Sequence, residues 1–315
     1  MTVSNRRIGT SELEVAPLAL GGNVFGWTAD ERASMAVLDS FTAAGGNFID
    51  TADSYSFWAP GNQGGESETI IGRWLSARGN RNEVVLATKV SQHPDFKGMT
   101  PSTIRSGAEA SLKRLNVDVI DLYYAHFDDL ATPLEDSAEA MSALVDTGKV
   151  RYIGISNYSP DRIRLWLNIC QENGLHSPIA LQPQYSLMER GIEHDLLPLA
   201  EQAKLSVIPY YSLARGFLTG KYRGGAAVDS PRAGAARAYL DERGERVVAV
   251  LESIGQQHGV APATIALAWL AAQPSVAAPI ASARSKEQLK DLVAHFALRL
   301  SPVELSLLDD ASRLR

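Results

Sequence analysis

The chain has 315 residues, 45% of them hydrophobic, and its 30 basic and 36 acidic residues give a formal net charge of −6. These values are those of a globular protein with a substantial core, and they exclude a disordered, fibrous or membrane-spanning chain. The acidic balance favours solubility and provides no general basic surface for nucleic acid. We therefore expect neither nucleic acid nor a membrane among its partners.

Cysteine, histidine and the first residues narrow the class further. The single cysteine, Cys170, excludes an intrachain disulfide and a thiolate metal cage, and its helix-like surroundings predict a buried core position. The six histidines are scattered without an HxxH or HExxH pair, so no metal site is predicted. No hydrophobic segment follows the polar residues 1–7, which predicts a cytoplasmic protein.

Short apolar runs alternate with helical patterns along the chain. A polar opening at 6–16 predicts a small hairpin, and eight apolar runs predict strands at 18–20, 48–49, 84–86, 119–120, 153–155, 179–181, 207–208 and 277–280. Helical patterns, several opened by Thr-Pro or Ser-Pro, predict helices at 30–43, 66–75, 101–114, 133–146, 160–172, 194–202 and 263–271. Residues 223–246, rich in Gly, Ala and Arg, interrupt this alternation and are interpreted as either a lid over the active site or a solvated surface loop.

The alternation predicts an α/β fold, a (β/α)8 TIM barrel with a short N-terminal hairpin, in which residues 1–315 form a single domain. A doubly wound sheet of two domains is the competing architecture, because alternation alone does not separate the two. Such a sheet normally carries a GxGxxG turn when it binds a dinucleotide, and the sequence has none. The loop-like residues 216–222 are one residue too short for a phosphate loop and lack its final Ser or Thr.

Seven of the predicted strands finish on polar or ionisable residues. Buried parallel strands are almost continuously apolar, so polar residues at their ends indicate a function. In a barrel the carboxyl ends of the strands converge at one pole, where active sites lie, and we therefore expect the endings to form one site. They are Asp50, Lys89, His126, Ser156 with Asn157, Gln182, Tyr210, and Ser282 with Arg284.

Four residues at this pole predict proton transfer to a carbonyl oxygen. A buried Asp50 beside a buried Lys89 forms an ion pair that keeps the lysine charged. The cation favours the phenolate of Tyr55, five residues beyond Asp50, and is expected to lower the pKa of Tyr55 from about 10. Tyr55 is then a usable proton donor for reduction by hydride, and His126 can orient the same carbonyl oxygen.

Several motifs closely resemble the aldo-keto reductase family. They are NFIDTADSY at 47–55, SE at 67–68 with WL at 74–75, LATKV at 86–90, DLYYAH at 121–126, GKVRYIGISN at 148–157 and QPQYS at 182–186. The resemblance extends in order from residue 7 to about residue 308. It implies an NADP-dependent reductase that passes hydride from NADPH to a small-molecule aldehyde or ketone, with Asp50, Tyr55, Lys89 and His126 as catalytic tetrad.

The resemblance also implies how NADPH is held. Ser156, Asn157 and Gln182 would bind the nicotinamide carboxamide, and Tyr210 would stack on its ring. Arg284 would pair with the 2′-phosphate, for which the hydroxyls of Ser282 and Ser285 and the amine of Lys286 are alternative partners. The full set expected at the cofactor is Gly22, Asn23, Ser156, Asn157, Gln182, Tyr210, Ser212, Leu213, Arg215, Gly216, Lys221, Ser282, Arg284 and Gln288.

Three positions depart from the family pattern. Leu292 stands where many relatives have an asparagine that holds the adenine. Tyr211 and Ser212 follow Tyr210 where relatives often have Ser and Pro, so either tyrosine is a candidate for stacking. Asn23 stands where Thr is common, a change that a backbone contact would survive.

Aromatic residues in the loops after the strands predict an apolar or sugar-stacking substrate pocket. The candidates for its walls are Trp27, Phe57, Trp58, His93, Phe127 and residues of the segment 223–246. Neither the substrate nor the oligomeric state follows from the sequence. Two other functions fit the same residues: a lyase that forms a Schiff base on Lys89, and a cofactor-binding regulatory subunit like the channel-associated members of the family.

Overall fold

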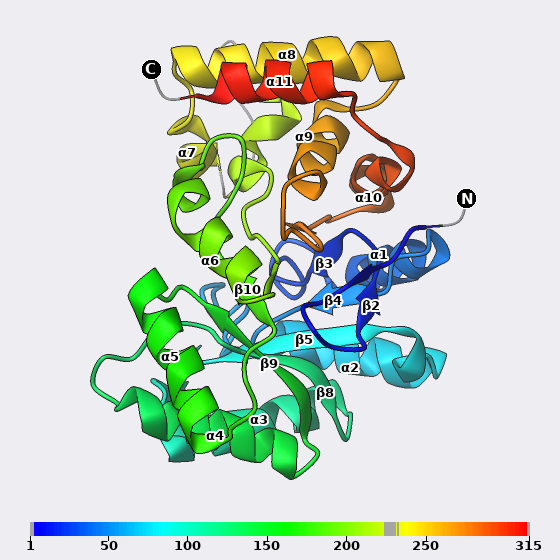
Figure 1. The fold of residues 1–315 in the computed structure, drawn as a ribbon. Coiled ribbons are helices and arrows are strands. Elements are labelled where there is room, and N and C mark those ends of the chain that lie inside the picture. The colour runs from blue at the N-terminus through cyan, green and yellow to red at the C-terminus, as the bar shows by residue number, and fades with distance from the viewer. Residues whose placement is uncertain (1–2, 224–230, 232, 314–315) are drawn as a thin grey trace.

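Eight parallel strands form the centre of the protein (Figure 1). The computed structural model describes residues 3–223, 231 and 233–313. In order around the sheet the strands are β11 (Ser206–Val207), β10 (Ala180–Gln182), β9 (Val150–Ser156), β8 (Ile120–Ala125), β5 (Val85–Val90), β4 (Phe48–Asp50), β3 (Ala19–Gly21) and β12 (Ile280–Ala281). The predicted (β/α)8 fold is confirmed.

Hydrogen bonds between the first and last strands close the sheet into a barrel. β12 pairs in parallel with β3, with Ile280 opposite Ala19. The segment just before β12 meets β11, where the Val207 amide donates to the Ser275 carbonyl at 2.7 Å and the Ala277 amide donates to the Val207 carbonyl at 3.0 Å. The carboxyl ends of all eight strands therefore lie at one pole.

Helices surround the barrel and follow the strands along the chain (Figure 1). They are α1 (Glu31–Ala43), α2 (Glu66–Arg78), α3 (Pro101–Leu115), α4 (Leu134–Asp146), α5 (Pro160–Asn173), α6 (Leu196–Gln202), α9 (Pro262–Ala271) and α10 (Lys286–Val293). Local chemistry sets their starts: Thr100 and Ser159 accept backbone amides at the beginning of α3 and α5, each directly before a proline. The seven predicted helices are confirmed, with ends displaced by up to three residues.

Four α-helices of the described residues were not predicted: α7 (Ala233–Arg237), α8 (Glu242–His258), α10 and α11 (Pro302–Ser312). α8 and α11 pack side by side outside the ring of helices (Figure 1). α8 begins inside the segment interpreted as a loop, because the Asp241 carboxylate caps it by accepting the Gly244 amide at 2.7 Å. The loop interpretation is therefore wrong for the second half of the segment, which holds α7 and the start of α8, whereas the lid interpretation stays a prediction. Residues 224–230 and 232 lie outside the described residues.

The hairpin predicted from residues 6–16 is present, and it closes the pole opposite the strand ends. It pairs β1 (Arg6–Arg7) with β2 (Glu14–Val15) in antiparallel fashion. Its apolar residues Ile8 and Leu13 pack with Phe48 and other side chains inside the barrel. Gly9 turns the chain with φ +54°, and a Cβ there would lie 2.4 Å from the Ile179 carbonyl oxygen, so the tight fit requires glycine. A second hairpin, β6 (Gln92–His93) with β7 (Phe96–Lys97), follows β5.

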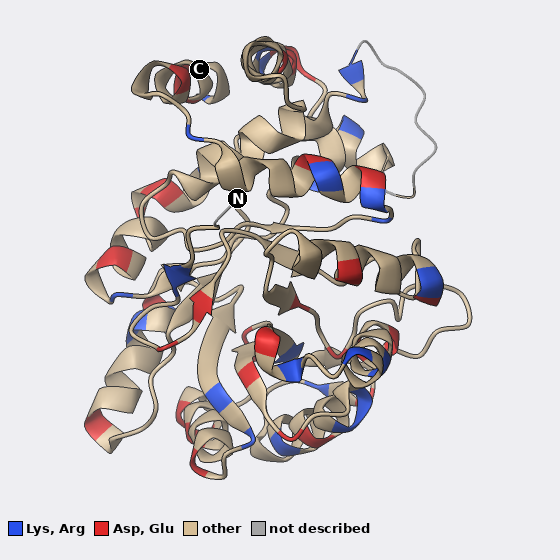
Figure 2. Cartoon of the chain, turned by 90° about the vertical axis from the view of Figure 1, so that its right-hand side faces the viewer, with Lys and Arg blue, Asp and Glu red and all other residues tan. Residues whose placement is uncertain are grey.

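Cys170 and the charged residues agree with the expected globular fold. Cys170, in α5, is 1% exposed and belongs to the core between strands and helices, which confirms its predicted burial. Figure 2 shows basic and acidic residues interspersed over the surrounding helices. Within the described ranges, no helix is long and apolar enough to cross a membrane.

Candidate active site

The four residues predicted for catalysis lie together at the carboxyl pole of the barrel. Asp50 ends β4, Lys89 lies near the end of β5, His126 directly follows β8, and Tyr55 lies in the loop after β4. Lys89 Nζ donates to Asp50 Oδ2 at 2.6 Å and to Tyr55 Oη at 3.1 Å. The rings of Tyr55 and His126 meet edge to face with their centroids 6.3 Å apart. Strand order thus gathers residues that are far apart in the sequence.

Lys89 is held as a buried cation. Its side chain is 0% exposed, and its three ammonium protons have three acceptors, the third being the Thr51 carbonyl oxygen at 2.7 Å. Burial acts to lower the pKa of Lys89, but the charges and hydrogen bonds of Asp50 and Tyr55 outweigh it, so that the pKa lies above its ordinary value. The lysine therefore presents a fixed positive charge to Tyr55.

The pKa of Tyr55 differs from the prediction. Burial raises this pKa, and although Lys89 lowers it, burial and the negative charge of Asp50 prevail, so that the pKa of Tyr55 lies above its ordinary value. The predicted net lowering is wrong because it considered the cation and not the desolvation of the phenolate. Tyr55 consequently stays protonated at neutral pH, which is the form that donates a proton.

His126 is a neutral imidazole beside Tyr55. Burial, with a further contribution from the charge of Lys89, lowers the pKa of His126 well below its ordinary value. Its Nδ1 is buried and has no hydrogen-bond partner among the described residues. Because Nδ1 has almost no accessible surface, a molecule in the cavity would reach the imidazole only through the part of the ring that lines the cavity.

The residues expected at the nicotinamide are bonded to one another and to the tetrad. Ser156 Oγ donates to the backbone oxygen of Gln182 at 2.8 Å, and Asn157 Nδ2 donates to Ser156 Oγ at 2.9 Å. Tyr210 Oη donates to Asn157 Oδ1 at 2.8 Å. Gln182 Nε2 donates to Asp50 Oδ1 at 2.9 Å. One hydrogen-bonded network therefore joins the ends of β4, β9 and β10 to the segment after β11.

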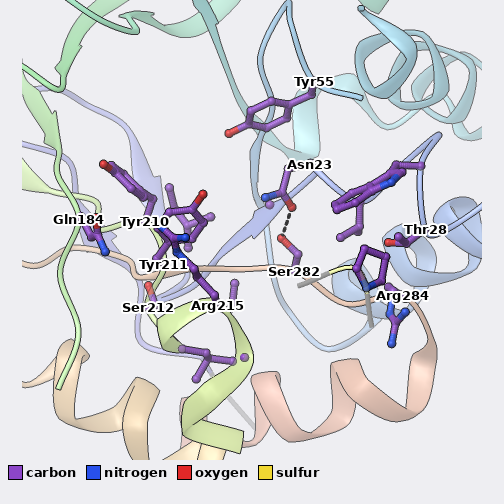
Figure 3. A pocket seen from close by; sticks show the side chains of 18 of the residues that line it. Asn23, Thr28, Tyr55, Gln184, Tyr210, Tyr211, Ser212, Arg215, Ser282 and Arg284 are labelled. Atoms are coloured by element: carbon purple, nitrogen blue, oxygen red, sulfur yellow. Dashed lines mark hydrogen bonds between the residues drawn. The ribbon is translucent and has the colours of Figure 1, made fainter. Parts of the chain in front are cut away.

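A cavity of about 750 Å³ opens at this pole, lined by Tyr55 and His126. Most residues expected to bind the cofactor also line it: Asn23, Asn157, Gln182, Tyr210, Ser212, Leu213, Arg215, Gly216, Lys221, Ser282, Arg284 and Gln288. Gly22, Ser156, Asp50 and Lys89 do not line the cavity. Lys89 is bonded to Tyr55 and Asp50 to Gln182, and both of these partners do line it. Figure 3 shows Tyr210 and Arg284 at opposite ends, with Tyr55 facing the space between them.

Three cationic side chains line the cavity with unused hydrogen-bonding capacity. Arg215 Nε is buried without a partner within the described part of the chain, and its guanidinium lies 4.7 Å from the centre of the Tyr211 ring. Lys221 Nζ lies 3.7 Å from the position of a Cβ on Gly216, whose φ is +96°. The guanidinium of Arg284 forms no ion pair or hydrogen bond within those same ranges. Such groups suit phosphate oxygens.

Two hydrogen bonds lie at the end of the cavity near Arg284, one of them between the segments that follow β3 and β12. Ser282 Oγ donates to Asn23 Oδ1 at 2.7 Å (Figure 3). The Arg284 amide donates to Gln288 Oε1 at 2.9 Å. Leu292, at the position where an adenine-binding asparagine is missing, is 4% exposed and lines the cavity with an apolar surface. Two alternative partners considered for the 2′-phosphate do not line the cavity: Ser285 and Lys286.

Aromatic side chains line the cavity around Tyr55. Trp27, Phe57, Trp58 and Phe127 all line it, as predicted. The Trp58 ring meets Trp27 edge to face at 5.6 Å and Tyr55 at 6.1 Å. Phe57 and Trp58 are 47% and 44% exposed, so their ring faces are available to a bound molecule.

His93 was predicted as a pocket wall, and this is wrong. The residue is 5% exposed and lies away from the cavity, with its Nδ1 accepting the Asp95 amide at 3.1 Å. Its neighbour Gln92 lines the cavity instead, because successive side chains of β6 point to opposite faces. Thr28 and Gln184 also line it unpredicted, and Thr28 Oγ1 is buried without a partner within the described ranges. Thr28 and Gln184 could have been predicted only from their closeness in the sequence to Trp27 and Gln182.

The whole barrel matches one protein family. Residues 17–313 fit the family model described as "Aldo/keto reductase family", a match that includes the tetrad and all the strands of the barrel. The chain belongs to the aldo/keto reductase family. Membership in this family supports an oxidoreductase activity, and it agrees with the fold and with the cavity at the strand ends.

Relatives within the aldo/keto reductase family are similar over nearly the whole chain. Protein tas of Escherichia coli is 34% identical over 94% of this chain and 93% of its own. Norsolorinic acid reductase of Aspergillus flavus is 32% identical over 95% of this chain and 78% of its own. The probable voltage-gated potassium channel subunit beta of Oryza sativa is 33% identical over 90% of this chain and 88% of its own.

Proposed function

We propose that the protein is a carbonyl reductase that uses NADPH to reduce an aldehyde or ketone. The observation that carries this proposal is the series of contacts from Asp50 through Lys89 to Tyr55, which ends in a protonated phenol at the cavity wall. Lys89 stabilises the phenolate that remains when Tyr55 gives its proton to the carbonyl oxygen. His126, a neutral imidazole that lines the cavity beside Tyr55, hydrogen-bonds and orients the same oxygen.

NADPH is the cofactor that the cavity fits best. Arg284 would pair with the 2′-phosphate that distinguishes NADPH from NADH, and Arg215 and Lys221 would meet the pyrophosphate. Tyr210 would stack on the nicotinamide, since its hydroxyl is fixed by Asn157. The reduced nicotinamide, when bound, supplies the hydride. The remaining proposed cofactor contacts are Gly22, Asn23, Ser156, Gln182, Ser212, Leu213, Gly216, Ser282 and Gln288.

The cavity favours an uncharged, flat substrate. Its described charged lining consists of Arg215, Lys221 and Arg284, which are assigned to phosphates, and of Asp291 in α10. The aromatic residues around Tyr55 offer ring faces and edges to an apolar carbonyl compound. No described cation beyond those assigned to the cofactor lines the cavity for a carboxylate or phosphate on the substrate.

The proposal is tested by following the oxidation of NADPH, and separately of NADH, by absorbance. The substrate panel contains aromatic aldehydes, dicarbonyls and sugar aldehydes. We expect turnover that prefers NADPH and neutral aromatic aldehydes. Absence of turnover with every carbonyl, in protein that binds NADPH, would refute the reductase and favour a cofactor-binding regulatory subunit. The rice relative is named as a probable voltage-gated potassium channel subunit beta.

A Schiff-base lyase is the less favoured alternative. A nucleophilic lysine must be a neutral amine, whereas Lys89 is charged and all three of its protons are engaged. Borohydride trapping with a ketone substrate and without cofactor tests the alternative directly. We expect no adduct, and a stable covalent adduct on Lys89 would support the lyase.

A further inference from the structure

Gln182 contacts a catalytic carboxylate as well as the cavity. It ends β10, is 2% exposed and lines the cavity wall. Its Nε2 donates to Asp50 Oδ1 at 2.9 Å, while Lys89 Nζ donates to Asp50 Oδ2 at 2.6 Å. Asp50 is 0% exposed, and each oxygen of its carboxylate accepts from one side-chain donor.

We propose that Gln182 is a positioning residue for the proton donor and acts on Tyr55 through Asp50 and Lys89. The proposal rests on the reductase function and adds a second role to the cofactor contact expected of Gln182. The three bonds that carry it run from Gln182 to Asp50, from Asp50 to Lys89 and from Lys89 to Tyr55.

The first effect of Gln182 is geometric. With Oδ1 occupied by the amide, the Asp50 carboxylate presents only Oδ2 to Lys89. The ammonium then has one proton left for Tyr55, because its third proton goes to the Thr51 carbonyl. Without the amide, Oδ1 is free to turn toward Lys89 and to compete with Tyr55 for an ammonium proton. Gln182 therefore keeps Lys89 bonded to the phenol.

The second effect of Gln182 is electrostatic, and like the first it lowers the pKa of Tyr55. The negative charge of Asp50 raises the pKa of Tyr55, whereas Lys89 lowers it. An amide N–H pointing at the carboxylate partly compensates its charge. Removing the amide exposes Tyr55 to a stronger negative field and to a weaker contact with Lys89, and both changes raise the pKa of Tyr55.

The bond to Asp50 also fixes which way the Gln182 amide faces. A carboxylate accepts only, so the nitrogen must lie toward Asp50. Oε1 is then left for the cavity side, where Gln182 offers an acceptor to the cofactor. The two roles are compatible because they use different atoms of the same amide.

The test compares Gln182→Met, which keeps the side-chain length but has no amide, with Ser156→Ala as the matched control. Ser156 belongs to the same expected nicotinamide contacts, but its hydroxyl bonds the backbone oxygen of Gln182 and not Asp50. The readouts are the pH dependence of kcat in both directions and the Kd of NADP⁺ from tryptophan fluorescence. Carbon-13 NMR of labelled tyrosine, assigned with Tyr55→Phe, follows Tyr55 ionisation without requiring turnover.

In Gln182→Met, we expect the alkaline limb and the Tyr55 titration to move upward by about one pH unit, a tenfold change in the ionisation equilibrium. Ser156→Ala should weaken NADP⁺ binding and leave both titrations in place. An unchanged or lowered Tyr55 titration in Gln182→Met, whatever happens to the Kd, would overturn the positioning role. The NMR titration decides this even if the wild type reduces no carbonyl, an outcome that would overturn the reductase function alone.

Discussion

Replacing Asp50 with Asn tests whether its contact with Lys89 is a buried ion pair that the fold depends on. Asn has the shape of Asp but not its charge. The Lys89 and Asp50 side chains are 0% and 1% exposed and lie 2.6 Å apart, so the variant contains an ammonium with no counter-ion and almost no water. Leaving such a charge unpaired costs about 3–5 kcal/mol of the free energy of unfolding.

This loss converts to a measurable shift of the melting temperature. An unfolding entropy of about 2.1 cal/mol/K per residue amounts to about 0.66 kcal/mol/K over 315 residues, so Asp50→Asn should lower the Tm by about 5–8 °C. Calorimetry at neutral pH and one scan rate measures it. Glu109→Gln is the control, because it breaks the pair with Lys149, whose side chains are 56% and 40% exposed, and should cost at most about 1 kcal/mol.

The stability difference between Asp50→Asn and the wild type should also change with pH in a predictable direction. In the wild type the pKa of Lys89 is raised in the folded state. Its contribution to the free energy of unfolding is therefore complete below the unfolded-state pKa of about 10.4, and it is lost as pH rises through the folded-state pKa. Without Asp50, burial prevails and lowers the folded pKa of Lys89, so the variant recovers stability as pH rises toward about 10.4. The deficit should therefore shrink between neutral and alkaline pH. A constant deficit, or one no larger than that of Glu109→Gln, would refute the reasoning.

Three further predictions concern the proposed reaction. Tyr55→Phe should lower kcat by about 10²- to 10⁴-fold while the Kd of NADP⁺ stays unchanged; retained turnover in steady-state assays would show that another group supplies the proton. Arg284→Ala should raise the Kd of NADPH by about tenfold or more and that of NADH by less than about twofold, since a charged hydrogen bond to phosphate is lost; equal weakening in fluorescence titrations would remove Arg284 from the 2′-phosphate site. Trp58→Ala should raise the KM of aromatic aldehydes by up to about tenfold and leave short aliphatic aldehydes unaffected, because a ring contact is lost; equal effects on both substrates would exclude stacking on Trp58.

The sequence predicted the barrel and the gathering of the tetrad because both depend on a simple pattern. Short apolar runs with polar endings identify parallel strands and the pole to which they point. Asp50 and Lys89 therefore became neighbours as soon as their strands were assigned, and the structure places them 2.6 Å apart. The assignment of the site residues to catalysis and cofactor binding stays a prediction.

Other features depended on three-dimensional packing and were predicted wrongly or not at all. The sign of the Tyr55 pKa shift required the balance between burial and the Lys89 charge, which the sequence does not contain. α8 begins at an Asp241 cap within a segment whose glycines are typical of loops, although its alanines favour helix. His93 and Gln92 are adjacent, and only the alternation within a two-residue strand decides which of them lines the cavity. The amide of Gln182 reaches Asp50 across 132 positions of sequence.

The bond between Asn23 and Ser282 has a consequence for how the protein is made. It joins residues 259 positions apart, and β3 pairs with β12 over a similar separation. During synthesis the chain must therefore wait for its last strand before the sheet can close, with the free edges of β3 and β11 exposed meanwhile. Contacts of such long range make folding slow and leave an interval open to aggregation. A chain truncated before β12 would lack both a closed barrel and one wall of the cavity, so the proposed cofactor binding could arise only after β12 has been made.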